Sequence, residues 1–550
     1  MDKNEEARVL LTLGLSVKQV SKLRNESLHE RLPLDPKTNL TKRVLEKNVD
    51  LFVEPYDWIV SDRWGHDEID WEFSCGSPSF NFPYFHAESE MLRNLKHDEN
   101  NANLTIFKLP WFLKGIICIP NYSIAVGEEL TRNWLNNISN IGPKKKSSLL
   151  IGMKVKFANP TELAYHQEVV RNIQKSEPLQ GTQVVFSVNA ETTSGSPSNM
   201  PKREQPYTIF SDDPVLERYL AEVKDTAENA LIYWEKNPER AQYWYTLKHI
   251  KFGAAITGLP KTVRGVNQFP FEASLVRKDI SLVQVSRACQ VHFSEAKDWS
   301  LDAFDLETEL AHFLCNFHKS KIWIIKPAQE ARGSHIVLTD SIPVAISAMN
   351  LAGGDKIAQA YVQNPMLLNK TQKFDCRTLV VVQSFRPALE AWICIDGTYA
   401  RVARKAFDIK NLCLKQSHLT VSKYEKEDRM DRIDESVIPE ILSRQELCNY
   451  FDDVGQTWKN IIEPRAWLMI KQLLQCAGHW IGPDRLPSCG ACYGVDWLVD
   501  NLGYPKLIEI NFCPDLGTPA TICRNLEKTL LLALTKEVNE QIFDTGWKKL

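Results

Sequence analysis

The sequence has no long hydrophobic run, no regular cysteine spacing and almost no net charge. Its apolar stretches, such as Leu530 to Leu534, are far shorter than the ~20 residues that cross a membrane as a helix. The first residues, Met1 to Glu6, do not follow the pattern of a secretory signal. The 13 cysteines lie between Cys75 and Cys523 without the spacing of a disulfide framework, which is typical of a reducing compartment. We therefore expect a cytoplasmic protein without membrane contact, and the nucleus is the second compartment that these features allow.

The balance of charge gives no general attraction for nucleic acid. There are 66 Lys and Arg residues against 69 Asp and Glu residues, for a formal net charge of -3, so direct nucleic-acid binding is not expected. The basic run Lys144 to Lys146 is short and predicts a solvated loop. Cys489 and Cys492 form a single Cys-x-x-Cys motif without a second pair at zinc-site spacing, so we expect most cysteines to be buried small hydrophobes.

Changes in composition and hydrophobic periodicity divide the chain into four parts. A chain of 550 residues, 43% of them hydrophobic and 25% charged, is long enough for several globular domains. Residues 1–50 show helical periodicity, residues 51–187 have the short aromatic and β-branched runs of a β-rich domain, and residues 188–206 have the small, polar composition of a linker. Residues 207–550 alternate strand-like with helix-like segments, which predicts an α+β fold. In that part we expect strands at Ile322–Lys326, Thr378–Gln383, Leu389–Ile395 and Lys506–Asn511, and helices at Leu301–Phe317 and Trp467–Ala477.

Two apolar-rich, alternating runs near the C-terminal end predict an antiparallel hairpin. Residues 493–500 and 506–511 are separated by a short turn segment that contains glycine and proline. Counting outward from the turn sets Asp496 opposite Glu509, and strand alternation puts Asn511 on the same face as Glu509. Two carboxylates and an amide suit Mg²⁺, which prefers hard oxygen ligands and completes its coordination with water and phosphate oxygens. The sequence therefore predicts a Mg²⁺ site here, with an ordinary acidic sheet face as the alternative.

A buried type of strand ends at Lys326 and is followed by a loop of small residues. Residues 323–327 lead into the loop 328–336, which contains Gly333, before another strand begins. An ammonium at a strand end and the free backbone N–H groups of such a loop can bind phosphate. The segment therefore predicts a phosphate site, and a solvated lysine is the alternative.

Two further runs offer groups that a nucleotide could use. Residues 356–362 are extended and could present backbone donors and acceptors to the edge of an adenine. A second strand opens at Lys373, and alternation places Lys373, Asp375 and Arg377 on one of its faces. The planar guanidinium of Arg377 suits a phosphoryl group that passes between oxygens, whereas a surface ladder of salt bridges is the other interpretation of this face.

In this order and at these separations, the segments resemble the tubulin tyrosine ligase-like family of ATP-grasp enzymes. The resemblance covers residues 207–550. The N-terminal half also resembles the degenerate SET-like module that one member of the family carries ahead of its ligase-like domain, so residues 51–187 are expected to be SET-like. The segments that support both parts are Leu109–Phe112, Ile124–Arg132, Asn267–Pro270, Arg277–Asp279, Ala400–Ala403 and Ser417–Thr420.

The resemblance implies a ligase that uses ATP and Mg²⁺ to join an amino acid to a protein carboxylate through an acyl phosphate. Tubulin is the implied acceptor, in the cytoplasm and at microtubules, and chromatin proteins are further partners to consider. Mg²⁺ would be held by Asp496, Glu509 and Asn511, and Arg401 would face the substrate or a phosphate. The implied catalytic residues are Arg377, Lys326 and Glu509, and the implied ATP-binding residues are Lys326, Arg332, Gly333, Gln359, Ala360, Tyr361, Val362, Lys373 and Asp375.

Departures from the family pattern favour a second hypothesis. The loop carries His335 where the family usually has glycine, and a Cβ there could keep the backbone from wrapping phosphates closely. Val421 stands where many relatives have asparagine after the His-Leu-Thr run. The SET-like half has Asn133 and Trp134 where a catalytic tyrosine is expected, so methyl transfer is not expected. The alternative function is therefore a pseudoenzyme or regulatory scaffold that binds nucleotide and tubulin or chromatin proteins without ligation.

Overall fold

The computed structural model is a mixture of helices and sheets, as the sequence predicts. Among the residues it describes, no helix combines the length and the apolar character needed to cross a membrane. The expected helical region at residues 1–50, the expected linker at residues 188–206, Arg332 and Val421 lie outside the described residues. Described are residues 52–55, 71–74, 84–87, 95–108, 115–120, 129–134, 142–176, 207–223, 232–250, 259–317, 321–420, 441–452, 457–481, 488–535 and 546–550, apart from 153, 331, 332, 334, 350, 352, 387 and 524.

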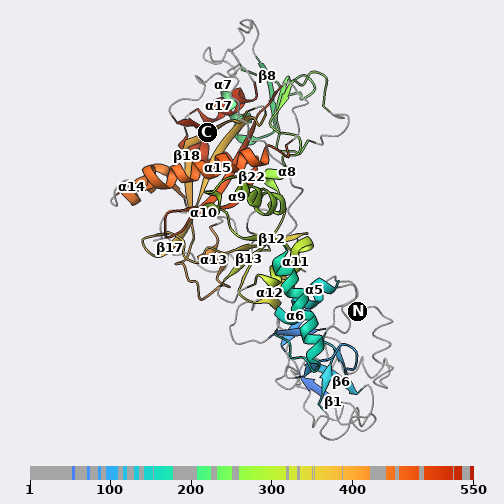
Figure 1. Ribbon diagram of the computed structural model, residues 1–550. Helices are drawn as coiled ribbons and strands as arrows, with labels where there is room; N and C mark the ends of the chain where they lie inside the picture. Colours follow the sequence, from blue (N-terminus) through green and yellow to red (C-terminus); the bar gives the residue numbers. More distant parts are fainter. Residues whose placement is uncertain are drawn as a thin grey trace, which may run out of the picture.

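A seven-stranded antiparallel sheet forms the centre of the C-terminal part (Figure 1). Its main strands lie in the order β19-β18-β17-β21-β22. Both faces are covered: Val380 and Val382 of β17 contribute to one hydrophobic core, and Leu379 and Val381 to the other, which explains the unbroken apolar run at these four positions. The strands are β16 (Leu367–Leu368), β17 (Gln372–Ser384), β18 (Glu390–Val402), β19 (Ile441–Ser443), β21 (Ala491–Val499), β22 (Pro505–Phe512) and β23 (Trp547–Lys549).

Helices cover each face of this sheet. The expected helix at residues 467–477 is α15, which begins earlier, at Glu463, with Pro464 in its first turn, where proline is well tolerated. The first core packs against α8 (Ala273–Val276), η3 (Asp279–Val285), α9 (Ser286–His292), α10 (Ala296–Trp299), α14 (Arg444–Asp452), η5 (Trp458–Ile462) and α15 (Glu463–Ala477). The second core packs against α7 (Pro214–Val223), α16 (Gly517–Ile522) and α17 (Leu526–Ala533).

A parallel sheet of five short strands adds to the second core. Ile209 and Tyr245 of this sheet are buried beside the leucines of α7 and α17. Its strands lie in the order β20-β11-β10-β8-β9. They are β8 (Tyr207–Ser211), β9 (Ile232–Trp234), β10 (Tyr243–Tyr245), β11 (Gly265–Val266) and β20 (Ser488–Cys489).

A four-stranded antiparallel sheet with the order β12-β15-β13-β14 carries the predicted phosphate strand. The helix expected over residues 301–317 is shorter, because residues 303–305 form β12 and the Asp305 carboxylate accepts the Glu307 amide as an N-cap. The helix therefore begins at Leu306. The elements are β12 (Ala303–Asp305), α11 (Leu306–Cys315), β13 (Trp323–Pro327), β14 (Val337–Thr339), α12 (Ile342–Ala348), β15 (Lys356–Ala360) and α13 (Lys415–His418).

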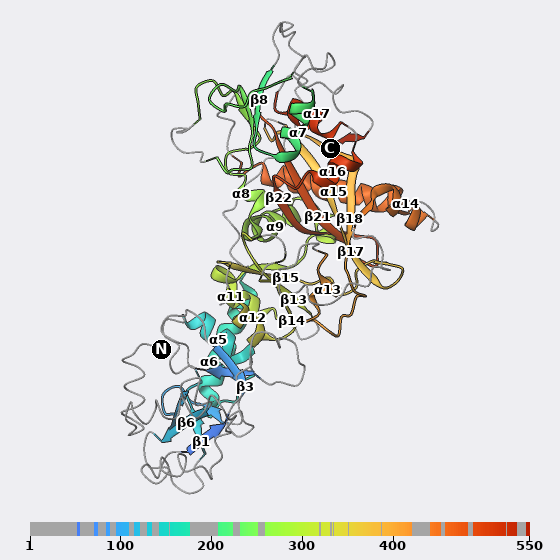
Figure 2. The same cartoon turned by 180° about the vertical axis from the view of Figure 1, so that it is seen from behind.

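The described residues of the N-terminal part form small sheets and the helices α5 and α6. The expectation of a solvated loop at Lys144–Lys146 is wrong, because these lysines form the first turn of α5 and the next turn buries Leu149 and Leu150. Figures 1 and 2 show α5 and α6 between the N-terminal strands and α11, and the leucines share one core with Phe313 of α11. The elements are β1 (Phe52–Pro55), β2 (Trp71–Ser74), β3 (Tyr84–Ala87), β4 (Lys96–His97), β5 (Leu104–Lys108), β6 (Gly115–Pro120), β7 (Thr131–Arg132), α5 (Pro143–Gly152) and α6 (Pro160–Lys175).

Gly490, between β20 and β21, is required by a close approach of two backbones. A Cβ built there would lie 2.5 Å from the Ala533 carbonyl oxygen at the end of α17. We predict that Gly490→Ala lowers the free energy of unfolding by about 1–3 kcal/mol, because the main chain must shift to admit the methyl group. Urea unfolding followed by tryptophan fluorescence measures this loss.

Gly152→Ala is the matched control. The atom closest to a Cβ at Gly152 is the mobile Cδ1 end of Ile342, at 3.1 Å, and alanine favours the helix that ends there. A loss at Gly152 as large as that at Gly490 would contradict the close-approach explanation.

Candidate functional site

Four adjacent strands bring the predicted charged residues into one row. Arg401 of β18 lies opposite Asp375 of β17, Arg377 of β17 lies opposite Asp496 of β21, and Asp496 lies opposite Glu509 of β22. The last pair is the register predicted from the hairpin turn. Because opposite residues in neighbouring strands share a face, residues far apart in the sequence meet on one surface of the sheet.

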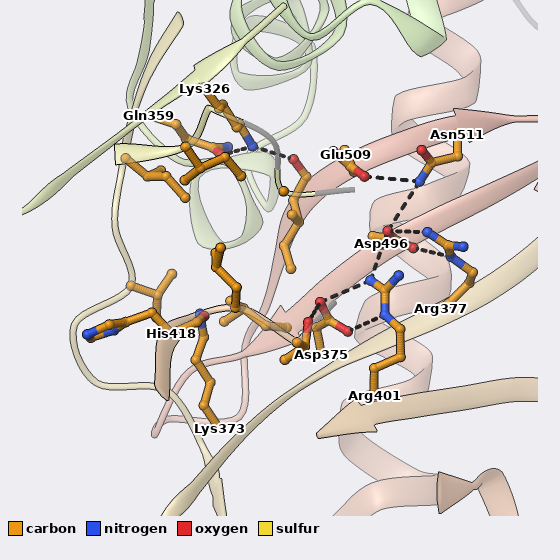
Figure 3. Close-up of a pocket in the computed structure, with 18 of the residues that line it drawn as sticks. Lys326, Gln359, Lys373, Asp375, Arg377, Arg401, His418, Asp496, Glu509 and Asn511 are labelled. Atoms are coloured by element: carbon orange, nitrogen blue, oxygen red, sulfur yellow. Dashed lines mark hydrogen bonds and ion pairs between the residues drawn. The ribbon is translucent and has the colours of Figure 1, made fainter. Parts of the chain in front are cut away.

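The Asp496 carboxylate is the centre of this row (Figure 3). Arg377 donates to both of its oxygens, from Nε and Nη2, at 2.7 Å each, and Arg401 Nη2 donates to Oδ2 at 2.9 Å. The side chain is 1% exposed. Burial would raise the pKa of Asp496, but the two guanidinium groups hold it below its ordinary value. Asp496 is therefore an anion in the folded protein.

Arg401 links this carboxylate to a second one. Its Nε and Nη2 atoms donate to Asp375 at 2.8 and 3.0 Å, and Thr420 Oγ1 also donates to Asp375. The guanidinium thus bridges two carboxylates while it lines the cavity described below. Its place next to Asp496 goes beyond the sequence-based expectation, which gave Arg401 only a contact with substrate or phosphate.

Glu509 and Asn511 extend the row on β22. Asn511 Nδ2 lies 3.2 Å from Asp496 Oδ2 and 3.2 Å from Glu509 Oε1. Lys278 Nζ lies 3.2 Å from Glu509 Oε2. Burial would raise the pKa of Glu509, but the neighbouring cations, Lys278 first, lower it.

Lys278 is the cation that sequence reasoning left out of the site. It belongs to the Arg277–Asp279 segment that supported the family resemblance, but that segment is more than 200 residues from Glu509 in sequence. No local pattern shows that the start of η3 lies beside β22, so only the folded chain reveals the pair.

Two buried lysines also line the cavity, Lys326 of β13 and Lys373 of β17. Lys326 Nζ donates to Gln359 Oε1 at 2.8 Å and to the Ile508 carbonyl at 2.9 Å. Lys373 Nζ donates to the His418 carbonyl at 2.6 Å. Burial lowers the pKa of Lys326 to about 7 and that of Lys373 to about 8. At neutral pH Lys326 is therefore divided between its neutral and protonated forms, and an approaching anion favours the protonated form.

A cavity of about 390 Å³ lies between these groups. The amides of Ala360 and Tyr361 already bond to the Asp302 and Ile322 carbonyls, so these two N–H groups are not free for an adenine. Apolar side chains form one part of the wall and charged side chains the other. The predicted residues that line the cavity are Lys326, Gly333, Gln359, Ala360, Tyr361, Val362, Lys373, Asp375, Arg377, Arg401, Asp496, Glu509 and Asn511, and the apolar wall includes Leu301, Ile324, Ile336, Leu498 and Ile508.

The loop after β13 adopts the backbone that a glycine would favour. Gly333 has φ 71° and His335 has φ 54°, both in the left-handed region. The His335 ring lies with Nδ1 2.8 Å from the Glu330 carboxylate. His335 thus adopts a backbone conformation that is less favourable for a residue with a Cβ than for glycine. Its ring contacts Glu330 within the same loop.

The donor set at Asp496, Glu509 and Asn511 fits Mg²⁺. The Asn511 amide lies 3.2 Å from a carboxylate oxygen of Asp496 and 3.2 Å from one of Glu509, and carboxylate and amide oxygens are hard ligands. The Asn511 amide faces the carboxylates with its nitrogen, so a rotation of the amide would bring its oxygen to the same place.

Comparison with known proteins gives one family for this part of the chain. The model of the tubulin-tyrosine ligase family matches residues 259–542, just over half of the chain and every residue of the charged row. Similar proteins include tubulin glycylase 3D of Tetrahymena thermophila (24% identity over 352 residues, 60% of this chain and 33% of the relative). They also include tubulin--tyrosine ligase-like protein 12 of Caenorhabditis elegans (27% over 272 residues, 46% and 38%) and tubulin polyglutamylase TTLL5 of Mus musculus (26% over 279 residues, 48% and 20%).

The chain spans less than two fifths of the length of each of these three relatives. The family expected from the sequence is confirmed. The relative from Caenorhabditis elegans bears the name of the family member that the N-terminal segments suggested. The SET-like character of the N-terminal half stays a prediction.

We predict that Asp496→Asn lowers the free energy of unfolding by about 3 kcal/mol or more, because it leaves two buried guanidinium groups without their shared carboxylate. Asp302→Asn is the matched control: Asp302 pairs with Lys321 at 2.8 Å, but both side chains are largely exposed. Its loss should stay within about 1 kcal/mol. Equal losses in chemical unfolding would show that the buried row contributes no more than a surface pair.

Proposed function

The chain belongs to the tubulin-tyrosine ligase family, and we propose that it is an ATP- and Mg²⁺-dependent ligase that joins an amino acid to a carboxylate of tubulin. The row of Arg377, Asp496 and Glu509, faced by Lys326, is the observation that carries the proposal. The printed names of the relatives, tubulin glycylases and a polyglutamylase, support the same class of reaction. In this proposal residues 207–550 bind the nucleotide, residues 51–187 are a SET-like positioning module, and the protein acts at cytoplasmic microtubules.

The charge of the cavity wall supports a nucleotide that arrives with its metal. Of the residues that the structure describes, four basic side chains line the cavity, Lys326, Lys373, Arg377 and Arg401, against four carboxylates, Asp375, Asp496, Glu509 and Asp515. A wall without net charge does not by itself balance a triphosphate. Mg²⁺ held by Asp496, Glu509 and Asn511 would supply the missing positive charge beside the phosphates.

The lysines and arginines of the site suit phosphoryl transfer. Lys326 and Arg377 would neutralise charge on the phosphate oxygens while the γ-phosphoryl group passes from ATP to the acceptor carboxylate. The acyl phosphate that results would be attacked by the amine of the incoming amino acid, so that an amide bond forms and phosphate leaves. Arg401, already bonded to two carboxylates, would hold Asp375 and Asp496 in place and face the substrate.

The other end of the cavity suits a base. Ile324, Leu498 and Ile508 supply apolar surface, and Gln359, Ala360, Tyr361 and Val362 form one edge. We propose that the adenine lies here and that Gln359, held by Lys326, connects the base end to the phosphate end. Lys373, with Gly333 and Arg332 of the loop, would complete the ATP site.

A second candidate function is nucleotide binding without ligation. The observation that favours it is the loop at His335, whose ring is bonded to Glu330 and whose backbone is in the left-handed region. A loop held by its own side chains closes less readily on a triphosphate than a glycine loop. In that case the protein would act as a nucleotide-dependent scaffold for tubulin or chromatin proteins.

We predict that Glu509→Gln lowers amino-acid incorporation by about 100-fold or more, because it removes a metal ligand and a charge next to the transferred phosphoryl group. The assay uses ATP, Mg²⁺, tubulin and labelled Tyr, Glu or Gly. Glu390→Gln, the same change at an exposed position of β18, is the control and should be without effect. Equal incorporation by wild type and Glu509→Gln would rule out the ligase. Nucleotide binding without any incorporation would favour the second candidate.

The lowered pKa of Lys326 predicts a pH dependence of nucleotide binding. In the free protein its pKa is about 7, and a bound triphosphate would raise it, so binding takes up a proton at higher pH. Affinity should be constant below about pH 7 and should fall above it, by at most about tenfold per pH unit.

Isothermal titration with a nonhydrolysable ATP analogue and excess Mg²⁺ from pH 6 to 9 tests this dependence. Lys326→Met should bind more weakly and show a smaller slope, and the comparison cancels the titration of the analogue itself. A residual slope belongs to Lys373, whose pKa is about 8. An identical slope in both proteins would remove Lys326 from the phosphate site.

A further inference from the structure

Four side chains of metal-ligand type meet in the N-terminal part, outside the catalytic cavity. They are His97 of β4, Glu99 just after it, and Glu162 and His166 of α6. One nitrogen or oxygen atom of each lies within 4.8 Å of the others. The spacing follows from the local structure, since Glu162 and His166 are one helical turn apart and the Glu99 amide donates to Glu162 Oε1 at 3.2 Å.

His166 presents an unsatisfied nitrogen to this cluster. The residue is 1% exposed, and its Nδ1 lies 2.9 Å from Ser147 Oγ. Within the part of the chain that the structure describes, Nε2 has no hydrogen-bond partner, and its distance of 3.9 Å from Glu162 Oε1 is too long for a hydrogen bond. In the tautomer whose Nδ1–H donates to Ser147 Oγ, Nε2 carries a lone pair on the side of Glu162, which is the arrangement of a metal-binding histidine.

His97 has a different role, which its backbone contact fixes. Its Nδ1 accepts the Trp134 amide at 3.1 Å, so the proton of the neutral ring is on Nε2. That nitrogen lies 3.2 Å from Glu162 Oε1, but the two atoms are not in hydrogen-bond geometry. A protonated nitrogen cannot bind a metal, so His97 lies beside Glu162 and is not itself a ligand.

We propose that His166 Nε2, Glu162 and Glu99 form a binding site for a divalent transition metal, with Ser147 as the group that orients His166. One imidazole and two carboxylates suit Zn²⁺, which takes nitrogen and oxygen ligands at about 2.0–2.2 Å and has room for water as a fourth ligand. The ligand atoms, which lie within 4.8 Å of one another, would draw closer together on binding.

Lys146 provides a further test of the proposal, because it would compete with the metal for the Glu99 carboxylate. Its ammonium contacts Glu99 Oε1 from the first turn of α5. A metal on Glu99 must displace this contact or share the carboxylate with it. Loss of the lysine charge should therefore tighten metal binding. If the four residues bind no metal, the same change would only remove the ion pair between Lys146 and Glu99.

The site would join the N-terminal strands to the helices that pack on the nucleotide-binding part. Glu99 follows β4, and α6 lies beside α5 and α11 (Figure 2). A bound ion would therefore fix the N-terminal strands against the pair α5 and α6. Its expected effect is on stability, independently of the ligase proposal.

The test is isothermal titration and thermal unfolding of the chelator-stripped full chain with Zn²⁺, and with Mg²⁺ as the hard-cation control. Wild type should bind one Zn²⁺ per chain with a midpoint of unfolding raised by about 2–4 °C, and Mg²⁺ should not reproduce this. Glu162→Gln, which keeps the shape of the side chain, should weaken Zn²⁺ binding at least tenfold, and so should His166→Gln. Lys146→Gln should strengthen it.

Two control variants separate this site from others. Glu168→Gln changes an exposed carboxylate on the same helix, and Glu509→Gln removes a carboxylate of the catalytic cavity. Both should bind Zn²⁺ as wild type does. Absence of stoichiometric binding in wild type, full binding by Glu162→Gln and His166→Gln, or loss of binding with Glu509→Gln would each overturn the proposal.

Discussion

The buried carboxylate of Asp496, held by Arg377 and Arg401, is the interaction on which the site depends. Taking a charge out of water costs several kcal/mol, and the cost is offset only when partners in good geometry surround it. Here Asp496 lies on β21 and its two partners come from β17 and β18, so three strands contribute to the cluster. The cluster therefore forms only when these strands pair in the correct register, because a shift of one residue would turn Arg377 into the core that holds Phe374 and Cys376.

The division of one strand face explains where the cavity lies. On β17, Lys373, Asp375 and Arg377 share a face with Leu379 and Val381, so this face is polar in its first half and apolar in its second. The apolar half is covered by α7 and α17, and the polar half lines the cavity together with Lys326 of the neighbouring sheet. The change from polar to apolar side chains along one face of β17 thus separates the site from the core.

The sequence predicted the parts of the site that depend on local rules. Alternation and the turn after residue 500 were enough to place Asp496 opposite Glu509, and alternation alone put Lys373, Asp375 and Arg377 on one face. The contact of Lys278 with Glu509 and the double partnership of Arg401 depend on tertiary packing, which no local pattern contains. The helix at Lys144–Lys146 was missed because a charged first turn conceals the apolar second turn. The chemical roles of the site residues stay predictions.

Helices α5 and α6 precede residues 177–206 in the chain, yet Leu149 and Leu150 lie in one core with Phe313. The expected linker in the sequence therefore does not mark the boundary between separately packed parts of the structure. A protease that cuts within residues 177–206 would leave two fragments held together by buried apolar surface, whereas a chain that starts at residue 207 would carry the uncovered side of α11 into solvent. The N-terminal part thus covers an apolar side of α11, although α11 belongs to the part of the chain that follows residue 206.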